Sequence, residues 1–202
     1  MRRIALLSLC LLLLLPLAAT GKDYKSNTAG DVGYIWLFMY DSHAGRIEID
    51  PALAYGGTLF QVIDFSWARN MVAEVHYLTA TARGEGFNWT DDDSTLFDLT
   101  IHHMSFNPGY FFEGRRLHPY ISGGFGAAYV LFEPFEGEDK KEWDLDMNLS
   151  GGVDFTVWET GMAALERVDL GFRARYLYVF QRDIVDTAIN GLALTLRLNL
   201  RW

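Results

Sequence analysis

Apolar and polar residues alternate along most of the chain, and most regularly at its C-terminal end. The alternate apolar positions there are Leu192, Leu194, Leu196, Leu198, Leu200 and Trp202. The positions between them carry Ala193, Thr195, Arg197, Asn199 and Arg201. Successive side chains of a strand point to opposite sides of a sheet, so this alternation predicts a strand with one apolar and one polar face.

Similar alternation recurs along the sequence. We predict strands at residues 32–40, 55–65, 71–82, 96–105, 119–132, 144–158, 168–180 and 192–202, with the facing of 55–65 left open. Outer-membrane barrels start at about eight antiparallel strands, and a strand of ~9–11 residues tilted by about 45° crosses a bilayer. The sequence therefore predicts an all-β fold, an eight-stranded antiparallel up-and-down transmembrane β-barrel.

The predicted connections alternate in length. Segments 42–54, 83–94, 133–142 and 181–187 are long, polar and acidic, whereas 66–70, 113–118 and 159–164 are shorter. Transmembrane barrels have long extracellular loops at one end and short periplasmic turns at the other. The alternation therefore supports a barrel whose two chain ends both lie in the periplasm.

Side-chain volume indicates which face of each strand is outside. The apolar faces are bulky, with Phe155, Phe172, Tyr176 and Trp202. The opposite faces mix charged residues with small ones, namely Gly124, Gly126, Ala128, Gly152, Gly171 and Ala193. The interior of an eight-stranded barrel is only wide enough for side chains to fill it. We therefore predict that the bulky apolar face meets lipid and the polar face lines the lumen.

The N-terminus has the organisation of a secretory signal. Arg2 and Arg3 precede a short apolar run that ends in Pro16 and small residues. A charged start, a short apolar stretch and a small-residue exit are typical of a signal peptide, and the run is too short for a spanning helix. We predict a removed signal peptide at 1–20, a periplasmic segment at 21–31 and the barrel at 32–202.

Composition excludes several classes of protein. The chain has 17 Lys and Arg against 26 Asp and Glu, a formal net charge of −9. Nucleic-acid binding needs a basic patch, so we expect no nucleic-acid partner. The only cysteine, Cys10, lies in the predicted signal peptide, which leaves no disulfide and no thiolate metal site.

Two stretches carry a family resemblance. Residues 119–126, Pro-Tyr-Ile-Ser-Gly-Gly-Phe-Gly, are similar to the Pro-Tyr-x-Gly-x-Gly-x-Gly strand of small Gram-negative outer-membrane barrels, with Ser122 at the first glycine position. The terminal strand also resembles theirs, because it is apolar at alternate positions and ends on an aromatic residue. The chain thus resembles the OmpA/OmpX and opacity-porin type. The resemblance implies that Leu194, Leu196, Leu198, Leu200 and Trp202 form a signal for the outer-membrane assembly machinery.

The predicted lumen carries both acids and bases. The ionisable members of this set are Glu74, His76, Asp98, His102, Asp146, Asp154, Asp169, Arg173, Arg175 and Arg197. Thr100, Asn148 and Arg201 are assigned to the same face. Buried charges must be paired, so we expect a lumen ion-pair network. A structural plug and a narrow or gated polar channel both fit this lumen, whereas a wide diffusion pore needs ~16–18 strands.

His103 and Ser105 raise the possibility of an enzyme. Their i, i+2 spacing places both side chains on one strand face. The arrangement resembles the His-x-Ser pair of small outer-membrane barrels that deacylate lipid A. The pair is expected ~16–21 Å below the outer loop, past the middle of the membrane. No carboxylate is clearly placed to orient His103. We therefore predict no catalytic residues.

The functional prediction is a membrane protein with a structural or surface-interaction role, such as adhesion or recognition, through its acidic loops. A small-solute channel is the alternative. We expect no cofactor and no metal, because His76 and His102 lack a clear third ligand and Asp91–Asp93 lacks the pattern of a calcium loop. Expected partners are outer-membrane lipid and lipopolysaccharide, the assembly machinery and periplasmic chaperones, with the barrel itself a monomer.

Overall fold

The structure, a computed structural model, describes residues 25–39, 47–65, 68–87, 94–112, 114–162, 165–180 and 188–201. The predicted signal peptide, Trp202 and the acidic run Asp91–Asp93 lie outside the described residues. No helix in the described ranges is long and apolar enough to cross a bilayer.

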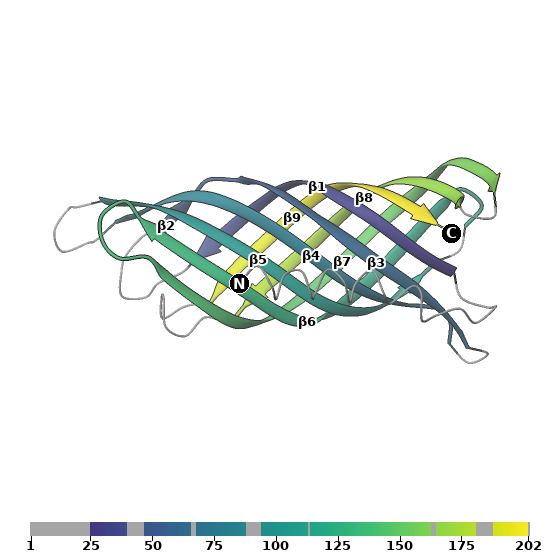
Figure 1. Cartoon of the computed structure of the whole chain (residues 1–202), viewed down its shortest axis with the longest axis horizontal. Coiled ribbons are helices and arrows are strands. Elements are labelled where there is room, and N and C mark those ends of the chain that lie inside the picture. Colours follow the sequence, from purple (N-terminus) through teal and green to yellow (C-terminus); the bar gives the residue numbers. More distant parts are fainter. Residues whose placement is uncertain are drawn as a thin grey trace.

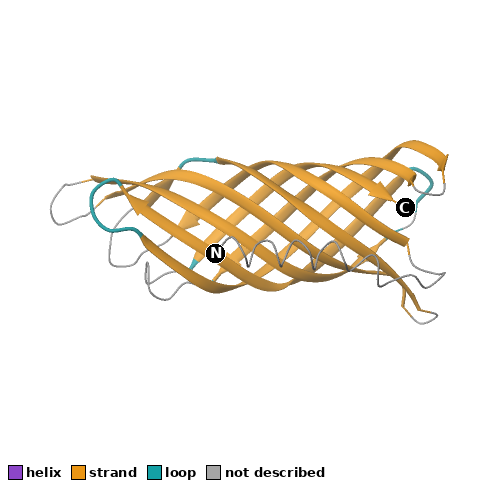
Figure 2. Ribbon diagram, in the orientation of Figure 1, coloured by secondary structure: helices purple, strands orange, loops and turns teal. Residues whose placement is uncertain are grey.

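Eight long strands form a closed barrel (Figure 1; Figure 2). They are β1 (Lys25–Met39), β3 (Ala52–Phe65), β4 (Ala68–Phe87), β5 (Ser94–Phe111), β6 (Leu117–Pro134), β7 (Lys140–Met162), β8 (Leu165–Val179) and β9 (Ile189–Arg201). Consecutive long strands pair antiparallel, and β1 pairs with β9 to close the barrel. The short strand β2 (Ile47–Ile49) adds to one end of β4. The predicted up-and-down barrel is confirmed.

The two ends of the barrel differ. The end that carries β2 and the β6–β7 connection, at the left of Figure 1, is called the outer end here. The opposite end, where β9 finishes at Arg201, is the inner end. Several strands extend beyond their predicted limits towards the outer end, so that Arg83 belongs to β4 rather than to a loop. The extension is consistent with a barrel wall that rises above the lipid-facing belt.

The register fixes the tilt of the strands. One row of paired residues starts at Trp143 on β7 and passes through Tyr129, His102, Thr79, Tyr55, Val32, Leu196 and Phe172. The row returns to β7 at Val153, ten residues nearer the inner end than Trp143. Such a stagger in an eight-stranded barrel corresponds to strands inclined by about 40–45°. Each step along the row from β7 towards β4 therefore descends towards the inner end.

Side chains alternate between the lumen and the outer surface. Bulky apolar residues are exposed on the outside, with Leu145, Leu196 and Phe172 among them, which agrees with the volume argument. Leu53 and Tyr55 are exposed while Ala54 is fully buried, and this settles the facing of the 55–65 strand. The narrow lumen has no room for these bulky side chains, so they lie outside. In a membrane, lipid would cover them.

β1 corrects the predicted N-terminal boundary. The strand begins at Lys25 and not at Val32, so part of the segment assigned to the periplasm belongs to the barrel wall. Its inward positions are Asn27, Ala29 and Asp31, all buried. The outward positions, Thr28 and Gly30, are not apolar, so the alternation that reveals the other strands is absent here.

Candidate functional site

The lumen has two chemically different halves. Buried apolar side chains fill the outer half, and they include Ile35, Leu37, Ala54, Leu78, Leu99, Ile101, Val130, Leu177, Val179 and Ile189. Buried polar and charged side chains fill the inner half, while the buried acid Asp144 lies beside Ala128 of the apolar cluster. The sequence predicts a polar lumen throughout, and the apolar half corrects that prediction. An apolar interior needs no charge pairing, so the candidate site is confined to the inner half.

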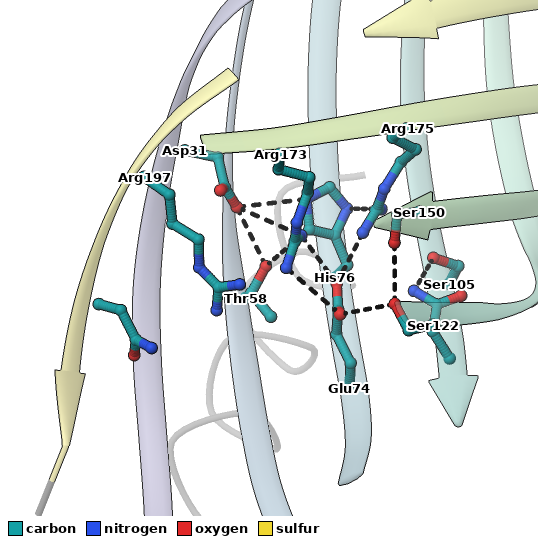
Figure 3. A network of polar contacts seen from close by, with 12 residues as sticks. Asp31, Thr58, Glu74, His76, Ser105, Ser122, Ser150, Arg173, Arg175 and Arg197 are labelled. Carbon is teal, nitrogen blue, oxygen red and sulfur yellow. Dashed lines mark hydrogen bonds and ion pairs between the residues drawn. The ribbon is translucent and has the colours of Figure 1, made fainter. Parts of the chain in front are cut away.

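Glu74 lies at the centre of the polar half. Arg173 donates from Nη1 to Glu74 Oε1 at 2.9 Å, and Arg175 donates from Nη2 to the same oxygen at 2.6 Å. Ser122 donates to Glu74 Oε2 at 3.2 Å. Figure 3 shows both arginines extending from β8 across the lumen to the carboxylate on β4. Two guanidinium groups on one carboxylate, all buried, give the charge compensation that a buried ion requires.

Asp31 and His76 extend this cluster towards β1. Asp31 Oδ2 accepts a hydrogen bond from Thr58 at 3.1 Å and lies 3.6 Å from Arg173 Nη1. The same oxygen lies 3.5 Å from His76 Nε2, while Arg175 contacts His76 Nδ1. Asp31 was missed from the sequence because it falls in the segment assigned to the periplasm. The contacts join β1, β3, β4 and β8 across the lumen.

A second group of charges lies nearer the inner end. Asp169 Oδ1 is 2.8 Å from Arg167 Nε, and its Oδ2 is 3.3 Å from Arg201 Nε. Asp154 accepts a hydrogen bond from Asn199 at 2.9 Å and lies 3.9 Å from Arg197. These contacts tie the inward face of β9 to β7 and β8. The C-terminal strand is therefore held from inside as well as by its backbone ladder.

Tyr120 of β6 connects the two groups of charges. Arg173 Nε donates to the Tyr120 hydroxyl at 2.8 Å, and the Arg173 guanidinium carbon lies 5.3 Å from the ring centroid. The guanidinium carbon of Arg197 lies 5.1 Å from the same ring. Cation–π contact of this kind is stronger where water is excluded. The tyrosine thus supports both arginines within the lumen.

Asp98, Thr100 and His102 are not in the lumen, which corrects their predicted assignment. All three face the outer surface of β5, where Asp98 pairs with Arg83 at 3.4 Å and His102 contacts Tyr77 and Thr79. Their neighbours Phe97, Leu99 and Ile101 are buried instead. The prediction assumed that polar residues face inward. On this strand the apolar residues face inward instead, because the outer half of the lumen is apolar.

The reversed facing brings His103 and Ser105 into the lumen. Ser105 Oγ lies 3.0 Å from His103 Nε2, and His103 Nδ1 lies 3.1 Å from Asp146 Oδ2 on β7. Asn107 donates to Ser105 Oγ at 3.0 Å, and Asn148 donates to Asn107 at 2.8 Å. The sequence identified no carboxylate beside His103, and Asp146 is the one that the fold supplies. Serine, histidine and aspartate follow one another as in hydrolytic triads.

A small residue on the intervening strand makes this arrangement possible. Gly126 of β6 pairs with Ser105 on one side and with Asp146 on the other. A Cβ atom at Gly126 would lie 2.8 Å from the Ser105 Cβ and 2.1 Å from the Met104 carbonyl oxygen. The missing side chain therefore lets residues of β5 and β7 approach each other over β6.

Three observations weigh against nucleophilic catalysis at this serine. Ser105, His103 and Asp146 are all buried within the filled lumen. The His103 Nδ1–H is not aligned for a hydrogen bond with Asp146, despite their 3.1 Å separation. Arg175 Nη1 also lies 3.4 Å from His103 Nε2, and a nearby cation opposes the protonation that a general base must undergo. The group is better described as part of a buried polar network.

No three His, Cys, Asp or Glu side chains come together as a metal site within the part of the chain that the structure describes. Ser122 and Ser150 hydrogen-bond to each other at 2.8 Å. The Ser122 hydroxyl also donates to Glu74, which adds one hydrogen bond to a carboxylate already held by two arginines. The chemistry available in the lumen is therefore hydrogen bonding and charge pairing.

Comparison with solved structures decides the class of barrel. Neisserial surface protein A (NspA) matches with a TM-score of 0.56 at 15% identity, over 89% of this chain and 97% of that one. The chain has the fold of the small outer-membrane β-barrels. The outer membrane protein OprG of Pseudomonas aeruginosa matches at 12% identity over 89% of this chain and 95% of its own, with a TM-score of 0.47. Ail of Yersinia pestis, the attachment invasion locus protein, matches at 13% identity over 88% and 99%, also with a TM-score of 0.47.

No protein-family model matches the sequence, and no curated protein matches it either. Identities of this size establish the fold of this small outer-membrane-type barrel and leave its activity to be argued from its own residues. The predicted assembly-signal residues Leu194, Leu196, Leu198 and Leu200 lie on the outward face of β9, and Trp202 lies outside the described residues. Their role in assembly stays a prediction.

Proposed function

We propose that the protein is an integral barrel of a Gram-negative outer membrane that acts through its outer surface and not as a conduit. Its wall carries exposed apolar side chains all round, such as Phe38, Leu145, Phe172 and Leu196. An outward apolar band around a barrel is the feature by which such proteins are held in lipid. Lipid, lipopolysaccharide and the assembly machinery are the partners that this location implies.

The observation that carries the proposal is the closure of the lumen at Glu74. Arg173 and Arg175 reach this carboxylate from the opposite wall at 2.9 and 2.6 Å, and all three side chains are buried. Above them the lumen is packed with apolar side chains. An ion crossing the barrel would have to separate the cluster and pass the apolar half. The arrangement therefore supports a structural role for the lumen.

The outer end offers a surface of strongly acidic character. Its described acidic residues are Glu48, Asp50, Glu85, Asp98, Glu133, Glu136, Glu138, Asp139 and Glu142. The described bases there are Arg83, Lys140 and Lys141. A field of one sign steers partners of the opposite sign and excludes those of the same sign. We infer that the exposed outer end binds or orients partners with basic surfaces, as an adhesion or recognition protein would.

The channel alternative makes a different demand on the same residues. It requires that Glu74 and the two arginines separate often enough to admit ions, and that water enter the apolar half. An enzyme would require that a substrate reach Ser105. The packing of the described residues weighs against both requirements, because Ser105 is 3% exposed and Glu74 is fully buried.

Neutralising the outer rim tests the surface role. The variant Glu136→Gln, Glu138→Gln, Asp139→Asn removes three exposed acids from the β6–β7 connection. Intact cells that display the wild type should bind fluorescent polylysine several-fold more than cells that display this variant. A matched control, Glu159→Gln with Glu166→Gln, neutralises exposed acids at the inner end and should bind like the wild type.

Both sets of variants must first show the heat-sensitive gel mobility of a folded barrel and equal amounts at the surface. Equal polylysine binding by the rim variant and the wild type would contradict a role for the acidic rim. Loss of binding in the inner-end control would show that charge as such, and not its position, decides the result.

A further inference from the structure

The apolar belt on the outer wall has an upper edge that is interrupted on two neighbouring strands. On β7 the belt continues outward through Leu145 to Trp143, and on β6 it continues through Tyr129. On β4 and β5 the outward positions become polar earlier. Above Tyr77 and Met104 these positions carry Thr79, which is buried, and Thr81, Arg83, Asp98, Thr100 and His102. We call this set, with Tyr77, the polar notch.

The register shows that the notch reaches below the edge of the belt. Trp143 pairs with Tyr129, Tyr129 with His102 and His102 with Thr79. Each step along this row descends by roughly 3 Å in a barrel of this tilt. His102 is therefore about 6 Å, and Thr79 about 9 Å, nearer the membrane centre than Trp143. On β3, beyond the notch, exposed Leu53 lies at about the depth of Thr79, so the edge of the belt is low on that strand too.

The polar groups of the notch are paired along the β4–β5 seam. His102 Nδ1 lies 2.9 Å from the Tyr77 hydroxyl and 3.0 Å from Thr79 Oγ1. Thr81 and Thr100 bond to each other at 2.9 Å. When both hydroxyls donate to Nδ1, the hydrogen of the neutral ring is on Nε2, the nitrogen that neither hydroxyl contacts. In that tautomer Nε2–H is a donor that neither hydroxyl occupies, at a depth where the wall of β7 is apolar at Leu145.

Aromatic rings continue from the notch across the neighbouring strands. Tyr77 and His102 are stacked with centroids 6.3 Å apart, and His102 and Tyr129 with centroids 6.1 Å apart. Tyr129 lies 5.1 Å from Trp143, which is 67% exposed. The row presents ring faces and edges beside the hydroxyls of Tyr77 and Tyr129. Aromatic platforms next to hydrogen-bonding groups suit ligands that have both C–H and O–H surfaces.

We propose that the polar notch binds the sugar headgroup of a glycolipid in the outer leaflet. A sugar ring lies against Tyr129 and Trp143, and one of its oxygen atoms accepts a hydrogen bond from His102 Nε2. The notch lets this polar headgroup lie deeper than it could on the neighbouring strands β6 and β7. The inference rests on the outer-membrane location proposed above.

The local charges favour a sugar over a phosphate as the recognised group. In and around the notch, the acids Glu85, Asp98 and Glu133 outnumber the bases Arg83 and Lys141, and Arg83 already pairs with Asp98. An anionic headgroup would meet net repulsion there. A second copy of this chain is also a poor fit, because two strands span roughly 10 Å, whereas a stable interface buries about 800 Å² per partner. A neutral hydroxylated ring fits both the size and the charge.

Lipid retention tests the proposal. The folded protein is placed in nanodiscs of equal parts phosphatidylcholine, phosphatidylglycerol and monogalactosyl diacylglycerol, and retained lipids are counted by native mass spectrometry. The wild type should retain the galactolipid at least threefold over either phospholipid. His102→Leu and Tyr129→Leu should each abolish most of that preference, while His102→Gln, which keeps an N–H donor, should preserve part of it.

Tyr178→Leu is the matched control, because Tyr178 is an outward aromatic of β8, away from the notch. This variant should retain galactolipid like the wild type. Equal retention of all three lipids, or equal preference in the His102→Leu and Tyr178→Leu proteins, would overturn the proposal. A preference for phosphatidylglycerol would assign an anionic headgroup instead, and a notch-dependent dimer mass would assign a second copy. None of these results depends on polylysine binding at the rim, so the two proposals fail separately.

Discussion

Glu74 on β4 and Arg173 on β8 meet across the lumen, with Arg173 Nη1 2.9 Å from Glu74 Oε1 and Nη2 3.3 Å from Oε2. The two strands are not neighbours in the barrel, since β3, β1 and β9 lie between them in the sheet order. Both side chains are fully or almost fully buried. The pair therefore joins opposite walls at the level where the lumen changes from apolar to polar.

Removing the Glu74 carboxylate should destabilise the barrel strongly. Glu74→Ala leaves Arg173 and Arg175 without their shared carboxylate, and breaking a buried ion pair in this way costs about 3–5 kcal/mol. The free energy of unfolding, measured by urea titration in lipid vesicles, should fall by that order. Glu138→Gln, on the exposed β6–β7 connection, should leave the unfolding free energy unchanged.

A triple substitution separates charge pairing from loss of volume. Replacing Glu74, Arg173 and Arg175 together by methionine removes every member of the cluster and keeps apolar volume in the lumen. Buried ion clusters replaced by apolar residues of similar size are often as stable as the original. The triple variant should therefore be more stable than Glu74→Ala. A triple variant that is less stable would show that charge pairing contributes net stability here.

Gly126 should tolerate no side chain. A Cβ atom there would lie 2.1 Å from the Met104 carbonyl oxygen and within 2.8 Å of Ser105 side-chain atoms. Gly126→Ala should lower the unfolding free energy by about 1–3 kcal/mol, as overpacking does. Gly30→Ala is the matched control on the outward face of β1, where an added Cβ would meet nothing within 4 Å. Equal stability of the two variants would contradict the close approach of β5 and β7 over Gly126.

The facing of β5 is open to a chemical test. The only cysteine of the chain, Cys10, lies in the predicted signal peptide, so single cysteine substitutions can be labelled without background. Asp98→Cys should react on intact cells with a membrane-impermeant maleimide, because position 98 is outward at the upper edge of the wall. Leu99→Cys should stay unlabelled, since Leu99 is fully buried. Labelling of position 99 but not 98 would restore the facing predicted from the sequence.

Much of the fold follows from alternation alone. The terminal strand and the strand with Arg173 and Arg175 each have one apolar and one charged face, and a narrow lumen cannot hold the bulky side. The same rule fails on β5, where Leu99 and Ile101 face inward because the outer half of the lumen is apolar. Alternation shows that a strand has two faces but not which face is inside. For a strand that passes both the apolar and the polar half of the lumen, the inward face is known only once its neighbouring strands are known.

The site was harder to predict than the fold. Glu74, His76, Asp146, Asp154, Asp169, Arg173, Arg175 and Arg197 are all buried inside the barrel. Their partners depend on strands far apart in sequence. Asp146 reaches His103 over Gly126, and Asp31 belongs to a strand whose outward residues lack the apolar signal. A register fixed by closure of the barrel supplies these contacts, and local sequence does not encode them.

Ser105 should be chemically inert. Its hydroxyl is buried and bonds with Asn107 and His103, so a small fluorophosphonate should not label it in the folded protein. Mass spectrometry of the treated protein checks this. Labelling of Ser105 in the wild type that is lost in His103→Ala would show an accessible, activated serine. That result would contradict the structural interpretation of this group.

The most direct test of a closed lumen is the single-channel conductance of the folded wild-type protein in a planar bilayer, with heat-modifiable gel mobility as proof of folding. Because Glu74 and the two arginines close the polar half and apolar side chains fill the other, we predict no discrete conductance steps above the lipid baseline. Reproducible steps that change in size with Arg173→Ala would contradict the account and make the barrel a channel.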